Sequence, residues 1–244
     1  MSEVTYQSSK GVAVITINRP KARNAVNTVA CQQLHEAWKR FAAEDDRVAI
    51  LTGAGPDFCA GGDVRDMPDN ALLCMPNLSV PCDKPVIAAV SGWVIGAGSS
   101  LTMMSDMAIA ASDSKFVYPE AKVGAFAGLM GGFPTRMPVK VGMQWTLTGD
   151  PMMAQRAYEI GFINEICEPG EQLPRALELA QKIAHNAPLV VRALKTLARE
   201  TLVKGPVENA FAHSLMLQGI RTSQDYEEGL SAINQKRKPN FIGR

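Results

Sequence analysis

The sequence predicts an α/β fold on three observations. Short apolar runs of strand character, such as Val48–Gly53 and Pro85–Val90, recur between segments of helical period. The chain opens on a candidate hairpin, and beyond Pro138 it changes to successive helices. Strand, helix and strand in repetition are typical of a core with parallel pairing. We therefore expect parallel strands covered by helices, followed by a helical C-terminal part.

The opening elements follow from turn and capping residues. "VTYQ" (Val4–Gln7) and "VAVITI" (Val12–Ile17) flank the turn-forming "SSKG", and this pattern predicts a hairpin. Asn27 or Thr28 can cap the next helix, in which apolar residues recur at helical spacing as far as Phe41.

Later elements follow from the same patterns. Met107–Ala111 predicts a fourth buried strand, and Ile163–Pro169 contains a last short one. Helices are expected at Val139–Leu147, Met152–Ile160, Gln172–Ala184 and Pro188–Val203, with two more through Asn234. The final helices carry more apolar residues than a lone surface layer needs, so we expect them to pack on another subunit. These features divide the chain into a core, residues 1–185, and a helical oligomerisation segment, residues 186–244.

Composition narrows the class of protein. Lys and Arg total 25 against 24 Asp and Glu, so no overall field favours nucleic acid or an anionic membrane. The five cysteines are scattered without a CxxC pair, which argues against a disulfide framework or a zinc site. No apolar run approaches membrane-spanning length, and the N-terminus lacks a basic region followed by an apolar one. The expectation is a soluble cytoplasmic protein.

The segment "IGAGSSL" (Ile95–Leu101) is the first candidate for chemistry. Gly96 and Gly98 after a strand suggest a dinucleotide loop, but Leu101 stands at the third glycine position and the required acidic residue is missing. The pattern G-x-S-x-G of a nucleophile elbow is absent too. A third use needs only the backbone, because the free N–H groups at a helix N-terminus suit a developing oxyanion.

A second small-residue segment, "FCAGGDV" (Phe58–Val64), follows the strand Val48–Gly53. Together with "KPVIAAVSGWVIGAGSSLTMMSD" and "FVYPEAKVGAFAGLMGG", it resembles the crotonase superfamily, the enoyl-CoA hydratase/isomerase family. "VAVITINRPKARNAVN" is similar to the opening of that family and "KRKPNFIGR" to its ending, so the resemblance covers nearly the whole chain.

The resemblance implies a spiral of ββα turns, a C-terminal helical trimerisation segment, and a trimer or dimer of trimers. It also implies acyl-CoA substrates with no separate cofactor and no metal. Two peptide N–H groups would stabilise a thioester enolate, and by position these belong to Ala60 and Ala97. Alanine at the second position departs from the commoner glycine, so its φ must stay negative or the backbone is strained.

The carboxylates decide the expected reaction. Family hydratases carry two glutamates, and by position Ser100 stands at the first and Glu120 at the second. One carboxylate disfavours water addition, whereas a single base can move a proton from C2 of a 3-enoyl thioester to C4. Apolar sequence neighbours would raise the Glu120 pKa in a dry site. These neighbours are Phe116, Val117, Tyr118, Val123, Ala125 and Phe126.

Isomerisation of an enoyl-CoA by Glu120 is therefore the first hypothesis. A second is a hydratase, acyl-CoA hydrolase or decarboxylase in which Ser100 and a water replace the missing carboxylate. Alternatively, Ser100 is only a helix N-terminal residue that satisfies a backbone donor. A third hypothesis, from another class, is a non-catalytic binding homologue; near-neutral charge argues against its RNA-binding form.

The resemblance also assigns residues to the substrate. It places Lys21, Ala22 and Arg23 along CoA, with Lys238 and Phe241 as weaker candidates. Gly61, Gly62 and Asp63 belong to the first oxyanion segment, where a structural role is expected for the aspartate. The connection Met67–Lys84 is shorter than in typical hydratases, so chain-length preference does not transfer. Its candidates for lining an acyl pocket are Leu72, Leu73, Met75 and Leu78.

Overall fold

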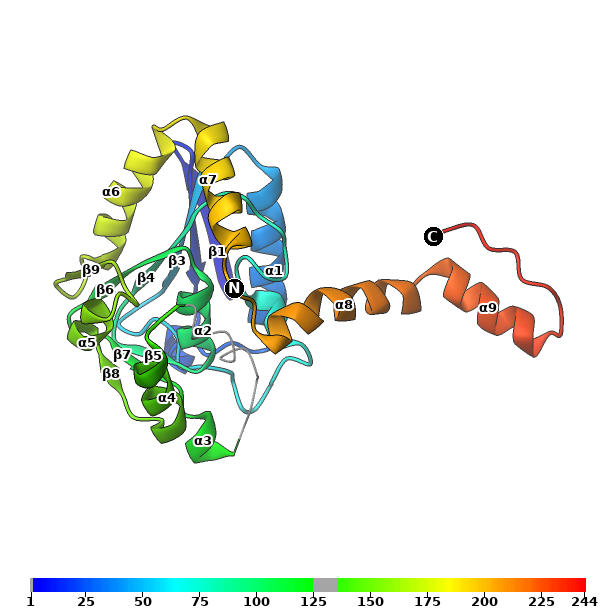
Figure 1. Cartoon of the computed structure of the whole chain (residues 1–244), viewed down its shortest axis with the longest axis horizontal. Coiled ribbons are helices and arrows are strands. Elements are labelled where there is room, and N and C mark those ends of the chain that lie inside the picture. The colour runs from blue at the N-terminus through cyan, green and yellow to red at the C-terminus, as the bar shows by residue number, and fades with distance from the viewer. Residues whose placement is uncertain (1, 125–135) are drawn as a thin grey trace.

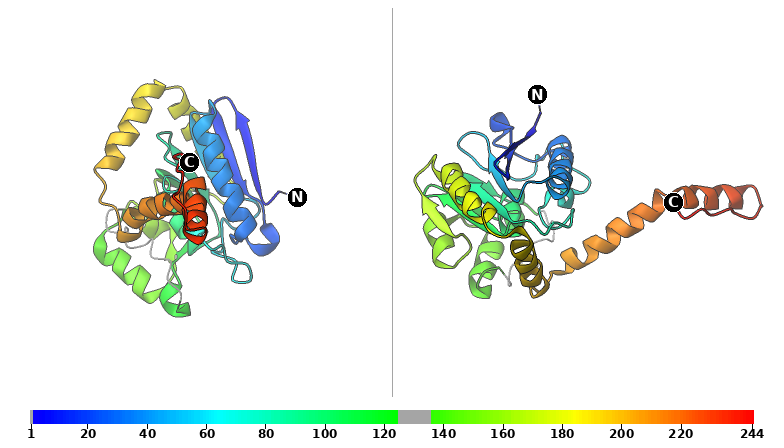
Figure 2. Two further views of the ribbon diagram at one scale, coloured as in Figure 1. Left: turned by 90° about the vertical axis from the view of Figure 1, so that its right-hand side faces the viewer. Right: turned by 90° about the horizontal axis from the view of Figure 1, so that it is seen from above.

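The computed structural model describes residues 2–124 and 136–244, except for the side chains of 212, 213 and 217. Figures 1 and 2 show a rounded body that contains the sheets and an elongated helical arm that projects from it. The chain begins in the body, and its C-terminus lies on the arm (Figure 1).

A six-stranded sheet forms the centre of the body, in the order β1-β2-β3-β4-β6-β9. Its strands are β1 (Val4–Ser9), β2 (Val12–Ile17), β3 (Val48–Gly53), β4 (Val86–Val90), β6 (Met107–Ala111) and β9 (Glu165–Cys167). The first two strands form the predicted antiparallel hairpin, and each later pairing is parallel. The α/β class and the strands predicted from apolar runs are therefore confirmed.

Helices cover both faces of this sheet. Leu51 points into the cluster that includes α1 (Thr28–Ala43), whereas its neighbour Ile50 points into the cluster of α6 (Gln172–Ala184). Successive side chains of a strand face opposite sides, so a continuous apolar run fits a sheet that is buried on both faces. Asn27 caps α1 as predicted, because its side chain accepts a hydrogen bond from a backbone N–H in the first turn.

A smaller sheet corrects one prediction. It consists of β5 (Trp93–Ile95), β7 (Lys115–Val117) and β8 (Met152–Met153), in that order. The predicted helix Met152–Ile160 is reduced to α5 (Ala154–Glu159). Met152 and Met153 pair antiparallel with β7 instead, because hydrogen bonding to a neighbouring strand overrides the local helical spacing.

Two strand–strand–helix units follow one another and position the site. In the first, β4 and β5 lead into α2 (Ala97–Met104); in the second, β6 and β7 lead into α3 (Glu120–Val123). Strands β5 and β7 are parallel, so their carboxyl ends lie at one edge of the small sheet. Short 3₁₀ turns occur at η1 (Pro20–Ala22) and η2 (Ala71–Cys74).

The remaining helices are α4 (Val139–Thr148), α7 (Pro188–Glu200), α8 (Pro206–Arg221) and α9 (Gln224–Asn234). Helix α7 lies against the body, where the buried Lys195 ammonium contacts Asn77, the Lys84 carbonyl and Asp106 at 2.6 to 2.8 Å. The projecting arm consists of α8, α9 and the tail that follows them (Figure 1). No helix in the described part of the chain is long and apolar enough to cross a membrane.

Candidate active site

A small cavity lies where the carboxyl ends of the strands meet the N-terminus of α2. Its volume is about 90 Å³. Apolar and small residues form most of its wall, and the side chains of Ser100 and Glu120 provide its oxygen atoms. The lining residues are Val26, Gly62, Met67, Pro68, Ala71, Leu72, Cys74, Met75, Ala97, Ser100 and Glu120.

The segment that follows β3 is held between two neighbours. On one side Cys59 pairs with Val94 of β5, and on the other Gly62 pairs with Val26. The Val26 pairing uses the carbonyl of Gly61 and the N–H of Asp63, at 2.8 and 2.9 Å. In such a ladder the central residue turns its own N–H to the opposite side. The Gly62 N–H has no acceptor among the described residues, and Gly62 lines the cavity.

This geometry corrects the predicted role of Ala60. Its N–H donates to the carbonyl of Arg23 at 2.9 Å and is already satisfied inside the fold. An N–H held in this way is not available to a substrate oxygen without breaking that bond. The unpaired N–H of Gly62, two residues further on, takes its place as the candidate donor of this segment. Sequence position pointed to a peptide of this segment whose N–H is already bonded within the fold.

The turn into α2 depends on two glycines. Gly96 has φ 50° and ψ −105°, a conformation that residues with a Cβ rarely adopt. A Cβ on Gly98 would stand 2.6 Å from the carbonyl oxygen of Cys59, so only glycine allows α2 to pack this close to the first segment. The Ser99 hydroxyl donates toward the carbonyls of Val94 and Val117, at 2.8 and 3.0 Å. These contacts fix the helix N-terminus beside Gly62.

Ala97 is the first residue of α2, and its φ is not positive, so its Cβ causes no backbone strain. The first N–H groups of a helix have no intrahelical acceptor. Across the described ranges the Ala97 N–H indeed has no partner, and Ala97 lines the same cavity as Gly62. The cavity is therefore bordered by two unpaired peptide donors from separate segments, the arrangement that binds an oxyanion.

Glu120 begins α3, three residues after Val117, the last residue of β7. Strand pairing brings this end beside Gly96, whose N–H donates to the Val117 carbonyl at 2.8 Å. The Glu120 Oε1 atom lies 3.4 Å from the position that a Cβ on Gly96 would occupy. Burial raises the pKa of Glu120 from 4.5 to about 7. Its Oε2 atom is buried and finds no hydrogen-bond partner in residues 2–124 and 136–244.

The raised pKa of Glu120 agrees in direction with the sequence prediction. Phe116, Val117 and Tyr118 are buried as expected, whereas the Val123 side chain is 67% exposed and does not shelter the carboxyl group. Ala125 and Phe126, the other predicted neighbours, lie outside the described residues. A carboxyl group that is half protonated near neutral pH is suited to both giving and accepting a proton.

Ser100 lies one helical turn into α2 and is buried. Its hydroxyl lines the cavity and has no hydrogen-bond partner in the described structure. The Ser99 hydroxyl, not that of Ser100, bonds to neighbouring backbone. Ser100 therefore does not serve as a structural cap, and its hydroxyl is free to bind a molecule in the cavity that Glu120 also lines.

Comparison with known proteins agrees with this geometry. The model of the enoyl-CoA hydratase/isomerase family matches residues 7–244. The chain belongs to the enoyl-CoA hydratase/isomerase family. Relatives include the (E)-benzylidenesuccinyl-CoA hydratase of Thauera aromatica, 35% identical over 98% of this chain and 99% of the relative. The carnitinyl-CoA dehydratase of Proteus mirabilis is 34% identical over the full length of both chains.

A solved structure confirms the fold of this family member. The probable enoyl-CoA hydratase/isomerase from Mycobacterium abscessus superimposes with a TM-score of 0.77 at 38% identity, with 100% of both chains covered. This chain is therefore an acyl-CoA enzyme of the crotonase family. The predicted family and the predicted α/β fold with C-terminal helices are confirmed, and the structure divides the strands into two sheets.

The predicted CoA residues near the N-terminus lie beside the first donor segment. Lys21 and Ala22 are in η1, and Arg23 follows it in a left-handed conformation. The N–H groups of Ala22 and Arg23 both donate within the turn, at 2.9 and 3.0 Å. Their carbonyls accept from the N–H groups of Ala25 and Ala60, so one lone pair on each carbonyl remains for a ligand. The Lys21 side chain is exposed, and that of Arg23 lies 3.8 Å from Asp57.

Asp63 is held by the fold. Its carboxylate pairs with Arg19 at 3.1 Å and accepts from the Arg65 N–H at 3.3 Å. The Arg19 guanidinium, followed by that N–H, lowers the Asp63 pKa. Gly61 has φ 101°, and its carbonyl accepts from Val26. Both residues thus shape the donor segment, and the structural role expected for Asp63 is supported by these contacts.

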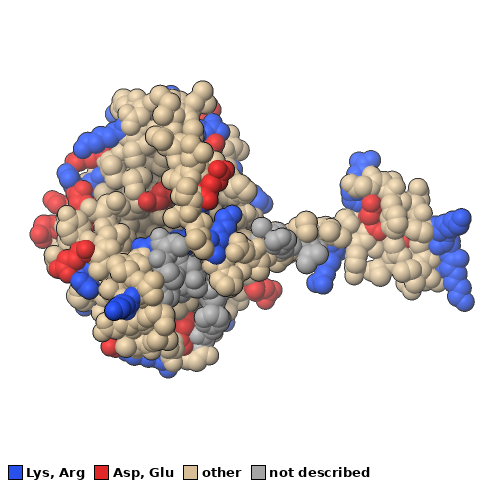
Figure 3. All heavy atoms as spheres, in the orientation of Figure 1, with Lys and Arg blue, Asp and Glu red and all other residues tan. Residues whose placement is uncertain are grey.

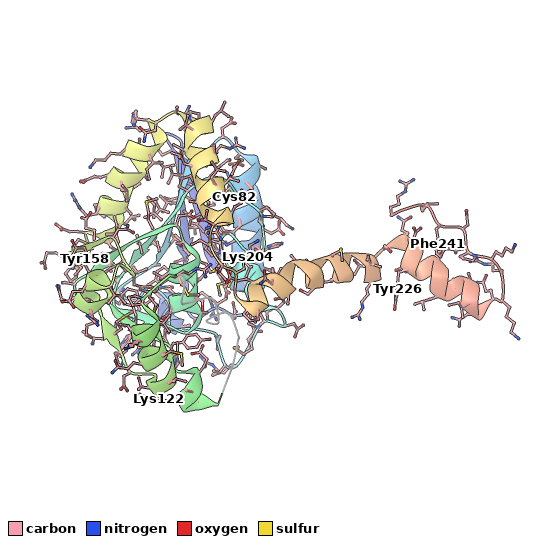
Figure 4. The ribbon with its side chains drawn as sticks, in the orientation of Figure 1. Cys82, Lys122, Tyr158, Lys204, Tyr226 and Phe241 are labelled. Carbon is pink, nitrogen blue, oxygen red and sulfur yellow. The ribbon has the colours of Figure 1, made fainter. Side chains whose placement is uncertain are left out.

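Lys238 and Phe241 lie on the tail of the arm. Figure 4 shows Phe241 far from the body, whereas Lys122, two residues after Glu120, lies at the body's surface. The Phe241 ring packs 3.7 Å from the position of a Cβ on Gly229, within the arm itself. The structure does not bring either residue to the cavity of the same chain.

The acyl-pocket candidates divide into two groups. Leu72 and Met75 line the cavity. Leu73 and Leu78 pack against the main hydrophobic cluster and do not line the cavity. Sequence reasoning missed five lining residues, although four of them lie in the connection Met67–Lys84. These are Val26, Met67, Pro68, Ala71 and Cys74.

Proposed function

We propose that this protein adds water reversibly to the double bond of a 2-enoyl-CoA thioester. The observation that carries the proposal is that Glu120, a carboxyl group with a pKa of about 7, shares one cavity with the free hydroxyl of Ser100 and two unpaired N–H groups. Relatives named as a hydratase and a dehydratase, both aligned over nearly all of this chain, support this direction of chemistry.

The N–H groups of Gly62 and Ala97 would bind the thioester carbonyl oxygen. As water attacks C3, negative charge moves onto that oxygen, and preorganised donors in a water-poor site stabilise this charge. Removing one donor of this kind typically costs about 10² to 10³ in rate. Because both donors are backbone groups, substitution of side chains at these positions leaves the chemistry of the donors unchanged.

Glu120 would move the proton. In its ionised form it accepts a proton from the water whose oxygen bonds to C3, and the resulting acid returns that proton to C2 of the enolate. The water is thereby divided between C3 and C2 with no other reactant. The Ser100 hydroxyl, which lines the same cavity, would hold the water in position, so one carboxyl group serves as base and then as acid.

Isomerisation of the double bond is the second candidate, and one observation favours it. Glu120 is the only carboxylate among the described residues that line the cavity. A single base suffices to take a proton from C2 of a 3-enoyl thioester, which forms a dienolate, and to return it to C4. Both reactions need the same donors and the same carboxyl group. They differ in whether water adds to C3 of the substrate or a proton is added to C4.

Product identification separates the two reactions. The protein is incubated with 2-enoyl, 3-enoyl and malonyl-type CoA thioesters, and the products are identified by mass spectrometry and chromatography. A 3-hydroxyacyl thioester from the 2-enoyl substrate is the expected product. A 2-enoyl product from the 3-enoyl substrate alone would establish isomerisation instead. Free CoA or carbon dioxide would indicate hydrolysis or decarboxylation, and CoA binding without turnover would indicate a binding homologue.

We also propose that residues 186–244 mediate assembly into a trimer or a dimer of trimers. Large apolar side chains are exposed along the arm, where a monomer would leave them in water. They include Met216, Ile220, Leu230, Ile233 and Ile242. In such an assembly Lys238 and Phe241 would reach a CoA bound to another subunit, because they lie on the arm, away from the body of their own chain. Light scattering at micromolar concentration tests this, and a monomer would contradict it.

A further inference from the structure

We infer that the acyl pocket selects a short, uncharged acyl group of about four carbons, and that the wall formed by Ala71, Leu72 and Met75 sets this limit. The inference rests on the proposed acyl-CoA site and specifies its substrate. It is carried by the size of the cavity, by the way its wall is anchored, and by the absence of a cation in the described wall.

The size of the cavity limits the acyl chain. An apolar cavity of about 150 Å³ in a protein holds benzene, which has six carbons. The cavity described here measures about 90 Å³. In proportion to volume, it accommodates roughly four carbon atoms. A longer chain needs either displacement of the wall or an exit past the mouth.

The wall is anchored to the core. The Trp38 Nε1–H of α1 donates to the Cys74 carbonyl at 2.8 Å, and the Asn70 side chain accepts from the Leu72 N–H at 3.3 Å. Cys74 and Met75 are almost completely buried, with exposed fractions of 0% and 3%. Because buried side chains in a close-packed interior move only at a cost in packing, this wall resists expansion.

The mouth differs from this wall. Met67 is 56% exposed, and its Sδ atom lies 2.7 Å from the position that a Cβ on Gly62 would take. Its thioether therefore lies over the candidate oxyanion donor. A flexible, exposed methionine can move aside when the thioester enters, so Met67 controls entry and the buried wall controls chain length.

Charge limits the acyl group further. No Lys, Arg or His is among the described lining residues, and Glu120 is their only charged group. A carboxylate at the far end of an acyl chain would be buried without a partner and close to Glu120, and burial of an unpaired charge is strongly unfavourable. The pocket therefore favours hydrocarbon acyl groups.

Binding of saturated acyl-CoAs tests the inference without relying on turnover. Calorimetry with acetyl-, butanoyl-, hexanoyl- and octanoyl-CoA is expected to give the tightest Kd for butanoyl-CoA, with octanoyl-CoA weaker by about tenfold or more, a penalty of overpacking. Glutaryl-CoA is expected to bind at least about tenfold more weakly than pentanoyl-CoA, which has the same number of carbons. Equal affinities along the series, or tighter binding of glutaryl-CoA, would overturn the inference.

Two substitutions change the wall in opposite directions. Met75→Ala enlarges the pocket and is expected to raise the affinity for hexanoyl-CoA relative to butanoyl-CoA. Ala71→Leu fills it and is expected to weaken butanoyl-CoA while sparing acetyl-CoA. Leu73→Ala is the matched control, because Leu73 packs on the core without lining the cavity. It should leave both affinity ratios unchanged, and a shift as large as that of Met75→Ala would refute the role of the wall.

These results distinguish the inference from the function on which it rests. If no acyl-CoA binds, the proposed function itself fails. If acyl-CoAs bind with no dependence on chain length or wall residues, only the inference about the pocket fails. The Ala71→Leu result also stands if Met75→Ala proves unable to fold.

Discussion

Replacing Glu120 with glutamine is expected to move activity and stability in opposite directions. The carboxyl group is held in a cavity where its Oε2 atom has no partner among the described residues. Glutamine keeps the shape of the side chain but carries no charge and accepts no proton. We expect Glu120→Gln to lose about 10² to 10⁴ in turnover, the usual contribution of a general acid–base group.

The stability change follows from the raised pKa. A shift from 4.5 to about 7 would correspond to roughly 3 kcal/mol for a fully buried carboxyl group. Glu120 is only half-buried, and solvent screening reduces this to about 1–2 kcal/mol. Ionisation of Glu120 therefore destabilises the folded protein by about this amount, and the neutral glutamine escapes the penalty.

The sign of the pH dependence is set by the direction of the shift. Because the folded pKa lies above the unfolded one, the folded state binds more protons, and stability falls as pH rises from 4.5 to about 7. The stability gain of Glu120→Gln should thus be near zero below pH 4.5 and complete above about pH 7. Wild-type kcat/KM should rise as the pH passes through the folded-state pKa of Glu120, about 7, because the base must be ionised.

Urea denaturation at several pH values and the pH profile of kcat/KM measure both effects. Glu168→Gln is a matched control, because Glu168 is exposed and outside the cavity. It should change neither turnover nor the pH dependence of stability. If Glu120→Gln retained wild-type turnover, Glu120 would not be the acid or base. If it gained no stability above pH 7, the carboxyl group would not be held in a dry site.

Three other substitutions test the surroundings of the site. Ser100→Glu restores a second carboxylate and should raise the rate of hydration by about tenfold or more. An unchanged rate in a folded variant would contradict the roles proposed for Glu120 and Ser100. Gly98→Ala places a Cβ 2.6 Å from the Cys59 carbonyl oxygen. It should cost about 1–3 kcal/mol of stability and lower kcat/KM, while equal stability in urea would show that the two segments have room to separate. Asp63→Asn removes the ion pair with Arg19, which lowers the Asp63 pKa. The variant should melt below the wild type at neutral pH, and the difference should vanish as the carboxylate is protonated below its ordinary pKa of 3.8; a difference that persisted in acid would have another cause.

Surface charge agrees with a small-molecule substrate. Figure 3 shows acidic and basic side chains intermixed over the drawn face of the body, while basic residues gather at the end of the arm. The totals of acidic and basic residues are also nearly equal, with a net charge of +1. Among the described residues, the drawn face of the body thus presents mixed charge and not the basic patch that is typical of a nucleic-acid site.

Local patterns predicted most of the fold. Asn27 caps α1, the hairpin forms at β1 and β2, and α6 spans the expected Gln172–Ala184. Each of these depends on neighbours in sequence, so residue type and spacing suffice. Met152 is the exception, because its strand conformation depends on pairing with β7, a partner more than thirty residues away in the chain.

Sequence by itself determined the family, the two glycine-rich segments and Glu120 as the remaining carboxylate. Only the tertiary structure decided which peptide of each segment is free. Position in the string "CAGGD" pointed to Ala60, but pairing with Arg23 satisfies the Ala60 N–H, whereas pairing with Val26 leaves the Gly62 N–H unpaired beside the cavity. Likewise the Glu120 pKa depends on burial by strands and helices brought together by folding, because desolvation is a property of the assembled site and not of the residue.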